Sequence, residues 1–309
     1  MFLLFWISFT VAQTQERPIT VNAVKNQNNS VDISYEKSKP GTYNVQLKFK
    51  NLDVGKNGKI RVVHIGDSHV QAGFFTNGLR KEFHEILGCG VKERGFVFPF
   101  AITQNTGPLN VVQKFEGEWK KVKTPNANLG INAIAVQSQD TAKLKLYFKN
   151  QNGYELDFDS VCVFGHWDTA FFNCWIKGNL DKNWHLSLPY HWIKLDILSD
   201  TLHLILEPKN TSDKNQNAQI NGLYLGNNLN GITFSEIGLN GAKLSDFLSA
   251  PLLNKELKFL QPDLIIVSLG TNDLVKAKLD SLLFYNQYDS LLFKLKHANK
   301  LASIILTVP

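Results

Sequence analysis

The stretch RVVHIGDSHVQAGFF, residues 61–75, decides how this chain folds. A short apolar run, rich in β-branched residues, stops at Gly66, and an amphipathic pattern follows after a polar corner. Such a run is typical of a buried parallel strand, and apolar residues three and four positions apart are typical of a helix. The sequence therefore predicts a strand over 59–65, a tight turn and a helix over 70–87.

Two kinds of sequence pattern alternate along the rest of the chain. Residues 231–309 repeat the strand-and-helix pattern of residues 59–87, with buried strands in PDLIIVSLGTND and ASIILTVP and a helix over 278–301 between them. Strands alternating with helices imply a parallel sheet covered by helices on both faces. Residues 109–230 instead carry short alternating runs separated by turn residues, which favours a β-sandwich. We therefore expect an α/β domain formed by 59–108 and 231–309, with the sandwich inserted.

The N-terminal region has its own predicted organisation. Residues 1–12 of MFLLFWISFTVAQTQE have the apolar run and small-residue end of a signal peptide; a mis-set start codon or a buried strand are the alternatives. Residues 17–58 contain SVDISYE and TYNVQLKFKNL, whose alternation predicts a small β segment. No other stretch is long and apolar enough to cross a membrane.

The amino-acid composition argues against several classes of protein. The chain of 309 residues has 43% hydrophobic and 19% charged residues, which is typical of a globular protein rather than a disordered one. The net charge is +6, but the lysines are scattered along the sequence and form no basic stripe interleaved with aromatics, so we expect no nucleic-acid partner. Cys89, Cys162 and Cys174 form neither a disulfide framework nor a metal pattern. We expect buried thiols, with a bond between Cys162 and Cys174 as the alternative.

Ser68 lies on the corner where the first strand becomes a helix. A side chain on such a turn projects from the carboxyl edge of the sheet, next to the backbone N–H groups of a helix N-terminus. An exposed hydroxyl beside hydrogen-bond donors suits a nucleophile for acyl transfer. The competing interpretation is that Ser68 is only a helix N-cap, because serine and aspartate are favoured there.

Two further loops follow buried strands and should reach the same edge. GLNGA, residues 238–242, contains Gly241, whose lack of a Cβ lets its N–H approach an oxyanion closely. GTND, residues 270–273, contains Asn272, whose carboxamide is a second donor. An ordinary turn for Gly241 and an N-cap for Asn272 are the plain alternatives.

HIGDSH, IGLNGA and SLGTND together resemble the first three blocks of the SGNH (GDSL) hydrolases. The closest resemblance is to the branch of peptidoglycan O-acetylesterases, which carry a β-sandwich between the first two blocks, and RGFVFPFAITQNTGP resembles the segment that enters it. The resemblance implies a flavodoxin-like three-layer α/β/α domain. It implies Ser68 as nucleophile, with the Ser68 N–H, the Gly241 N–H and the Asn272 carboxamide as oxyanion donors. It also implies O-acetylated glycan substrates, no metal or cofactor, and a secreted or periplasmic location.

One block of the family pattern is missing. The family has an Asp-x-x-His pair near its C-terminus, and no such pair follows Asn272 here. We expect His64 to be packed in a strand, His69 to anchor the loop or contact substrate, and His297 to lie on the surface. The expectation is therefore a C-terminally truncated chain of an active esterase. The alternatives are a non-catalytic glycan-binding protein and a glycan O-acetyltransferase. Aromatics in GHWDTAFF are expected in the sandwich core, with sugar stacking as the other possibility.

Overall fold

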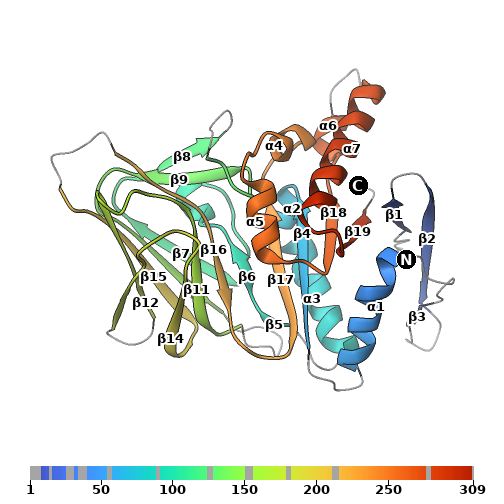
Figure 1. Ribbon diagram of the computed structural model, residues 1–309, viewed down its shortest axis with the longest axis horizontal. Helices are drawn as coiled ribbons and strands as arrows, with labels where there is room; N and C mark the ends of the chain where they lie inside the picture. Colours follow the sequence, from blue (N-terminus) through green and yellow to red (C-terminus); the bar gives the residue numbers. More distant parts are fainter. Residues whose placement is uncertain are drawn as a thin grey trace, which may run out of the picture.

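The computed structural model describes most of the chain. The described residues are 8–13, 16–25, 31–33, 40–53, 58–87, 91–123, 128–149, 156–178, 182–210, 216–275 and 280–307. Figure 1 shows two parts side by side, a sandwich of sheets and a sheet covered by helices, and both termini lie on the helical side.

The main sheet has eight strands in the order β3-β2-β1-β19-β18-β4-β17-β5. From β5 to β19 all neighbours are parallel, and β1 then pairs antiparallel with β19. β4 therefore lies between β17 and β18, and the order β17-β4-β18-β19 is the flavodoxin-like one. The strands are β1 Ser8–Gln13, β2 Glu16–Lys25, β3 Val31–Ile33, β4 Lys59–Gly66, β5 Val91–Glu93, β17 Gly231–Gly238, β18 Leu264–Ser268 and β19 Ser303–Leu306.

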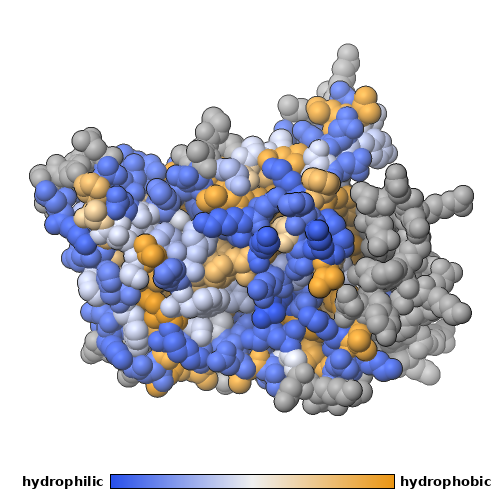
Figure 2. Space-filling model, in the orientation of Figure 1, coloured by the Kyte–Doolittle hydropathy of each residue, from blue (hydrophilic) through white to orange (hydrophobic). Residues whose placement is uncertain are grey.

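Helices cover both faces of this sheet. Because side chains alternate along a strand, Val62 of β4 faces α1 and α3, whereas Val63 faces the core beneath α5 and α7. The helices are α1 Pro40–Asp53, α2 Ser68–Gln71, α3 Phe74–Leu87, α4 Leu244–Leu248, α5 Leu253–Leu260, α6 Thr271–Leu274 and α7 Ser281–Ala298. None of the helices in the described ranges is long and apolar enough to cross a membrane. In Figure 2 hydrophobic residues gather near the tip of α7, where Leu282 and Leu283 are exposed.

The inserted part is a sandwich of two antiparallel sheets. One has the order β13-β12-β15-β10-β7, and the other β14-β11-β16-β9-β8, with β6 added beside β16. The strands are β6 Gly95–Val97, β7 Val111–Glu116, β8 Lys120–Lys123, β9 Ile134–Ser138, β10 Ala142–Phe148, β11 Phe158–His166, β12 Phe172–Lys177, β13 Asn183–His185, β14 Trp192–Ser199, β15 Thr201–Pro208 and β16 Ala218–Gly226. A single 3₁₀ turn in the described residues, Phe100–Thr103, lies between β6 and β7. The predicted fold, a flavodoxin-like α/β/α domain with an inserted β-sandwich, is confirmed.

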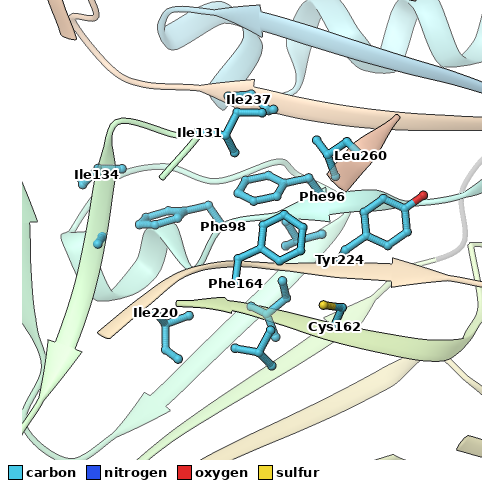
Figure 3. Close-up of a cluster of buried hydrophobic side chains, with 14 of the residues drawn as sticks. Phe96, Phe98, Ile131, Ile134, Cys162, Phe164, Ile220, Tyr224, Ile237 and Leu260 are labelled. Atoms are coloured by element: carbon cyan, nitrogen blue, oxygen red, sulfur yellow. The ribbon is translucent and has the colours of Figure 1, made fainter. Parts of the chain in front are cut away.

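The two parts share one hydrophobic core. Figure 3 shows Phe96 and Phe164 of the sandwich packed beside Ile237 of β17 and Leu260 of α5, and all four are buried. Phe164 also meets Phe259 edge-on, with ring centroids 5.0 Å apart. The insert is therefore packed against β17 of the main sheet and against α5.

The prediction of a strand in TYNVQLKFKNL was wrong. This segment lies in helix α1, and Val45, Phe49 and Leu52 pack in the core against the sheet. These three are spaced by four and three residues, which is the helical period. Val45, Leu47 and Phe49 also alternate with polar residues, which favoured the strand interpretation, but Leu47 is exposed.

The structure also bears on the predictions for the cysteines, the insert boundary and the two ends of the chain. Cys162 and Cys174 are free and buried, which confirms buried thiols, and burial raises the pKa of both; Cys89 lies outside the described residues. β6 already pairs with the sandwich, ahead of the expected boundary at residue 109. β1 pairs with β19, the strand that ASIILTVP predicted. The signal peptide over 1–12 stays a prediction; the described backbone of residues 8–13 is a strand.

Candidate active site

The three loops singled out from the sequence follow three adjacent strands. Gly66 at the end of β4 is in register with Gly238 of β17 on one side and with Ser268 of β18 on the other. All three strands are parallel, so their carboxyl ends meet at one edge of the sheet. β4 is also the strand where the order reverses, and α/β sheets bind their ligands at such a point.

The corner after β4 is built by Gly66 and Asp67. A Cβ at Gly66 would overlap the side chain of Val70, so only glycine lets the first turn of α2 fold back this closely. Asp67 is the N-cap of α2, and its carboxylate accepts a hydrogen bond from the His69 N–H at 3.0 Å. Asp67 therefore caps the helix, and Ser68 does not. The Ser68 side chain is half-buried and its hydroxyl makes no hydrogen bond with any residue in the described ranges.

Gln71 ties the first loop to the second. Its side-chain oxygen accepts from the Asn240 N–H at 2.7 Å, and its side-chain nitrogen donates to the Thr106 carbonyl at 2.8 Å. The Leu239 N–H donates to the Gly66 carbonyl at 3.2 Å. The GLNGA loop is therefore fixed directly beside the Ser68 corner.

Asn272 ties the third loop to the other two. Its side-chain nitrogen donates to the Ala242 carbonyl at 3.1 Å and lies 3.5 Å from Asp67 Oδ2. Gly270, with a φ of +122°, is the N-cap position of α6, so Asn272 is not a helix cap. Gly241 lies between Asn240, which is bonded to the first loop, and Ala242, which is bonded to the third. The structure thus brings the loops of Ser68, Gly241 and Asn272 together.

Three N–H groups at this junction have no strong acceptor. Within the described part of the chain, the backbone N–H groups of Ser68 and Gly241 donate to no residue. Gly241 adopts a φ of +71°, and a Cβ there would have no neighbour within 4 Å, so the space in front of it is open. Asn272 has two amide hydrogens, and only one is used well, because the 3.5 Å contact with Asp67 is too long for a strong hydrogen bond.

Two histidines near the corner have different surroundings. The His69 side chain is 75% exposed, and its Nδ1 lies 3.1 Å from Asp67 Oδ1, so the ring is anchored at one nitrogen while the other faces outward. His64 is fully buried, as expected, and its Nε2 lies 2.7 Å from Ser268 Oγ. Burial, and then the positive charge of Arg80, lower the pKa of His64 to about 3, against the opposing effects of Glu236 and Asp67. His64 is therefore neutral at physiological pH. His297 is exposed on α7, as expected.

A buried charge cluster beneath the corner was not predicted. Glu236 of β17 accepts from Arg94 at 2.7 Å, from Arg80 at 3.2 Å and from the Thr76 hydroxyl. Burial opposes the charge of Glu236, but the two guanidinium groups and Thr76 hold its pKa below the usual value. The cluster joins α3, β17 and the segment entering the sandwich. No local pattern could have indicated it, because its members are far apart in sequence. The described residues contain no group of three side chains suited to a metal ion.

Neither a family model nor a curated protein sequence matches this chain. A solved peptidoglycan O-acetylesterase superposes with a TM-score of 0.63 at 22% identity, over 84% of this chain and 69% of that chain. This chain shares the fold of that esterase. Family two carbohydrate esterases from Cellvibrio japonicus and Clostridium thermocellum both score 0.22, with 11% and 13% identity. These alignments cover 63% and 62% of this chain and 78% and 76% of theirs, and their scores are too low to indicate a shared overall fold.

Proposed function

We propose that this protein is a serine esterase that removes acetyl groups from O-acetylated glycans, with Ser68 as its nucleophile. The observation that carries the proposal is an unbonded hydroxyl at a corner where three loops place N–H groups without strong acceptors. Ser68 is not needed as a cap, because Asp67 takes that role. The shared fold with a peptidoglycan O-acetylesterase supports an acetyl ester as substrate.

In the proposed reaction Ser68 Oγ attacks the acetyl carbonyl carbon. The carbonyl oxygen becomes an oxyanion, which the N–H groups of Ser68 and Gly241 stabilise together with the amide hydrogen of Asn272 that is only weakly bonded to Asp67. The ester C–O bond then breaks, and the glycan oxygen takes up a proton and leaves as an alcohol. Water attacks the acetyl-serine, which releases acetate and restores the hydroxyl.

Ser68 also needs a proton acceptor for this chemistry. No histidine in the described ranges is hydrogen-bonded to Ser68, and the family resemblance assigns that role to an Asp-x-x-His pair. Because the proposed substrate is an O-acetylated glycan such as peptidoglycan, we also propose a location outside the cytoplasm, and the predicted signal peptide over 1–12 accords with it.

The test compares hydrolysis of an aryl acetate by the unaltered protein, by Ser68→Ala and by Ser245→Ala. Ser245 is an exposed serine on α4, just after the GLNGA loop, and serves as the matched control. We expect Ser68→Ala to lower kcat/KM by about a thousandfold or more and Ser245→Ala to leave it unchanged. Equal activity in the Ser68 variant and the unaltered protein would remove Ser68 from the mechanism.

A further inference from the structure

The outer face of the five-stranded sheet of the sandwich is a second surface with unusual chemistry. Along β10 the residues that point inward are buried and apolar, whereas Lys143, Lys145 and Tyr147 point outward and are exposed. The same alternation runs along β12 and β15. Figure 2 shows the sandwich, on the left of the molecule, largely covered by hydrophilic residues in that view.

Four basic residues form a straight row across this face. Strand pairing places Lys177 of β12 opposite His203 of β15, His203 opposite Lys145 of β10, and Lys145 opposite Lys114 of β7. Neighbouring strands are about 4.8 Å apart, so the row spans roughly 14 Å. These residues are some thirty positions apart in sequence, which is why the lysines looked scattered.

The row is a poor arrangement for stability alone. Like charges directly opposite one another destabilise a sheet, and in the described part of the chain neither Lys114 nor Lys145 forms an ion pair. Burial and the charges of Lys145 and Lys177 lower the pKa of His203. Two carboxylates of this face lie in other rows: Glu116 is 2.9 Å from Lys143, and Glu207 accepts from the Trp175 indole N–H at 3.3 Å.

The row of residues next to the basic row contains a pair of aromatic rings. Trp175 of β12 pairs with His185 of β13 on one side and Ile205 of β15 on the other. The rings of Trp175 and His185 have centroids 4.7 Å apart. This row lies two residues along the strands from the basic row, or about 7 Å away. The planes of the two rings are inclined at 58° to each other, so a tilted aromatic pair lies beside the row of basic residues.

We propose that this face binds an acidic polysaccharide. A sugar ring lies on Trp175, and carboxylate groups of the same chain lie on the row Lys177, His203, Lys145 and Lys114. Charge-assisted hydrogen bonds to lysine offset the repulsion within the row. The inference that the bound anion is part of a glycan rests on the proposed esterase function. The inference that the basic row binds an anion is independent of that function. The surface would hold the polymer while the Ser68 corner acts on its acetyl groups, so it restricts the substrate class to glycans that carry negative charge.

The experiment measures binding without relying on catalysis. The full-length protein is titrated with polygalacturonate, with uncharged dextran and with a single-stranded DNA oligonucleotide, at low and high salt. We expect binding of polygalacturonate that weakens with salt and little binding of dextran. The double variant Lys114→Glu/Lys145→Glu should bind polygalacturonate at least about tenfold more weakly. Trp175→Ala should also weaken it.

The control is Lys121→Glu/Lys123→Glu, which makes the same change in net charge on β8 of the other sheet, where both lysines are exposed. Its binding should match that of the unaltered protein. An equal loss in both double variants, no binding of polygalacturonate, or DNA binding as tight as glycan binding would each overturn the proposal. Aryl acetate hydrolysis by the Lys114/Lys145 variant should be unchanged, because that small ester does not reach the sandwich face. Loss of hydrolysis after Ser68→Ala therefore reports on the esterase separately.

Discussion

Glu256 of α5 is a buried carboxylate that joins the α/β domain to the sandwich. It accepts hydrogen bonds from the Ile131 N–H at 2.6 Å, the Tyr190 hydroxyl at 2.8 Å and the Asn221 amide at 2.9 Å. All three donors belong to the inserted part, and burial raises the pKa of Glu256 above its usual value. Replacing Glu256 with alanine would leave three donors without an acceptor.

The magnitude follows from these three bonds. Each buried donor left unsatisfied costs about 1–3 kcal/mol, and water entry reduces the sum, so we expect Glu256→Ala to lower the free energy of unfolding by about 4 kcal/mol. Glu256→Gln keeps one oxygen acceptor but turns an NH₂ group toward a donor, and should cost about 1–3 kcal/mol. Glu82→Ala, at an exposed position on α3, is the control and should change stability by less than about 0.5 kcal/mol.

Urea unfolding followed by tryptophan fluorescence measures these differences. A substitution at Gly130 provides a second test, because a Cβ at Gly130 would overlap the Glu256 carboxylate. Gly130→Ala should therefore destabilise the unaltered protein but cost less in the Glu256→Ala background, where the carboxylate is gone. If Glu256→Ala is as stable as Glu82→Ala, or if the two changes at Gly130 and Glu256 are additive, the reasoning about this junction is refuted.

Three further predictions concern the Ser68 corner and the charges beneath it. Asn272→Ala should lower kcat for an aryl acetate about 10²–10³-fold while destabilising the fold by only about 1 kcal/mol; a change in KM alone would argue against an oxyanion role. Asp67→Ala removes the cap of α2 and the His69 anchor, and should cost about 1–2 kcal/mol in thermal unfolding; Ser68 as the true cap would instead make Ser68→Ala the costlier change. Glu236→Gln should cost about 3–5 kcal/mol near neutral pH. Because the folded pKa of Glu236 is lowered, its contribution is present above about pH 4.5 and is lost as the pH falls through the folded pKa. The stability difference between Glu236→Gln and the unaltered protein should therefore shrink in acid, and a constant difference would contradict the ion-pair explanation.

Local patterns predicted the elements that build the corner. The apolar run before Gly66 and the turn after it predicted β4 and a helix over 70–87, which the structure divides into α2 and α3. The GLNGA and GTND loops lie at the ends of β17 and β18 as expected. Strand topology explains this success, because parallel strands must present their carboxyl ends at one edge. The helix α1 was misread because Val45, Leu47 and Phe49 alternate with polar residues, although the packed residues Val45, Phe49 and Leu52 follow the helical period.

The contacts between distant segments could not be predicted. Gln71 holding Asn240, Glu256 holding Tyr190 and the basic row on the sandwich each depend on register and packing rather than on neighbours in sequence. A lone buried glutamate or arginine has no local signature, since its partner is set by the tertiary fold. Two interpretations of Ser68 were open from the sequence, and the Asp67 cap removes one of them, the helix N-cap.

The central claim is that an acetyl group passes through Ser68. The most direct measurement is rapid acid quenching of the full-length protein during turnover of an aryl acetate, followed by mass spectrometry of the peptide that contains GDSH. The account predicts a peptide heavier by one acetyl group, with the modification on Ser68, and no such peptide from the Ser68→Ala variant. Turnover without acetylation at Ser68, or with the acetyl group on another residue, would contradict it.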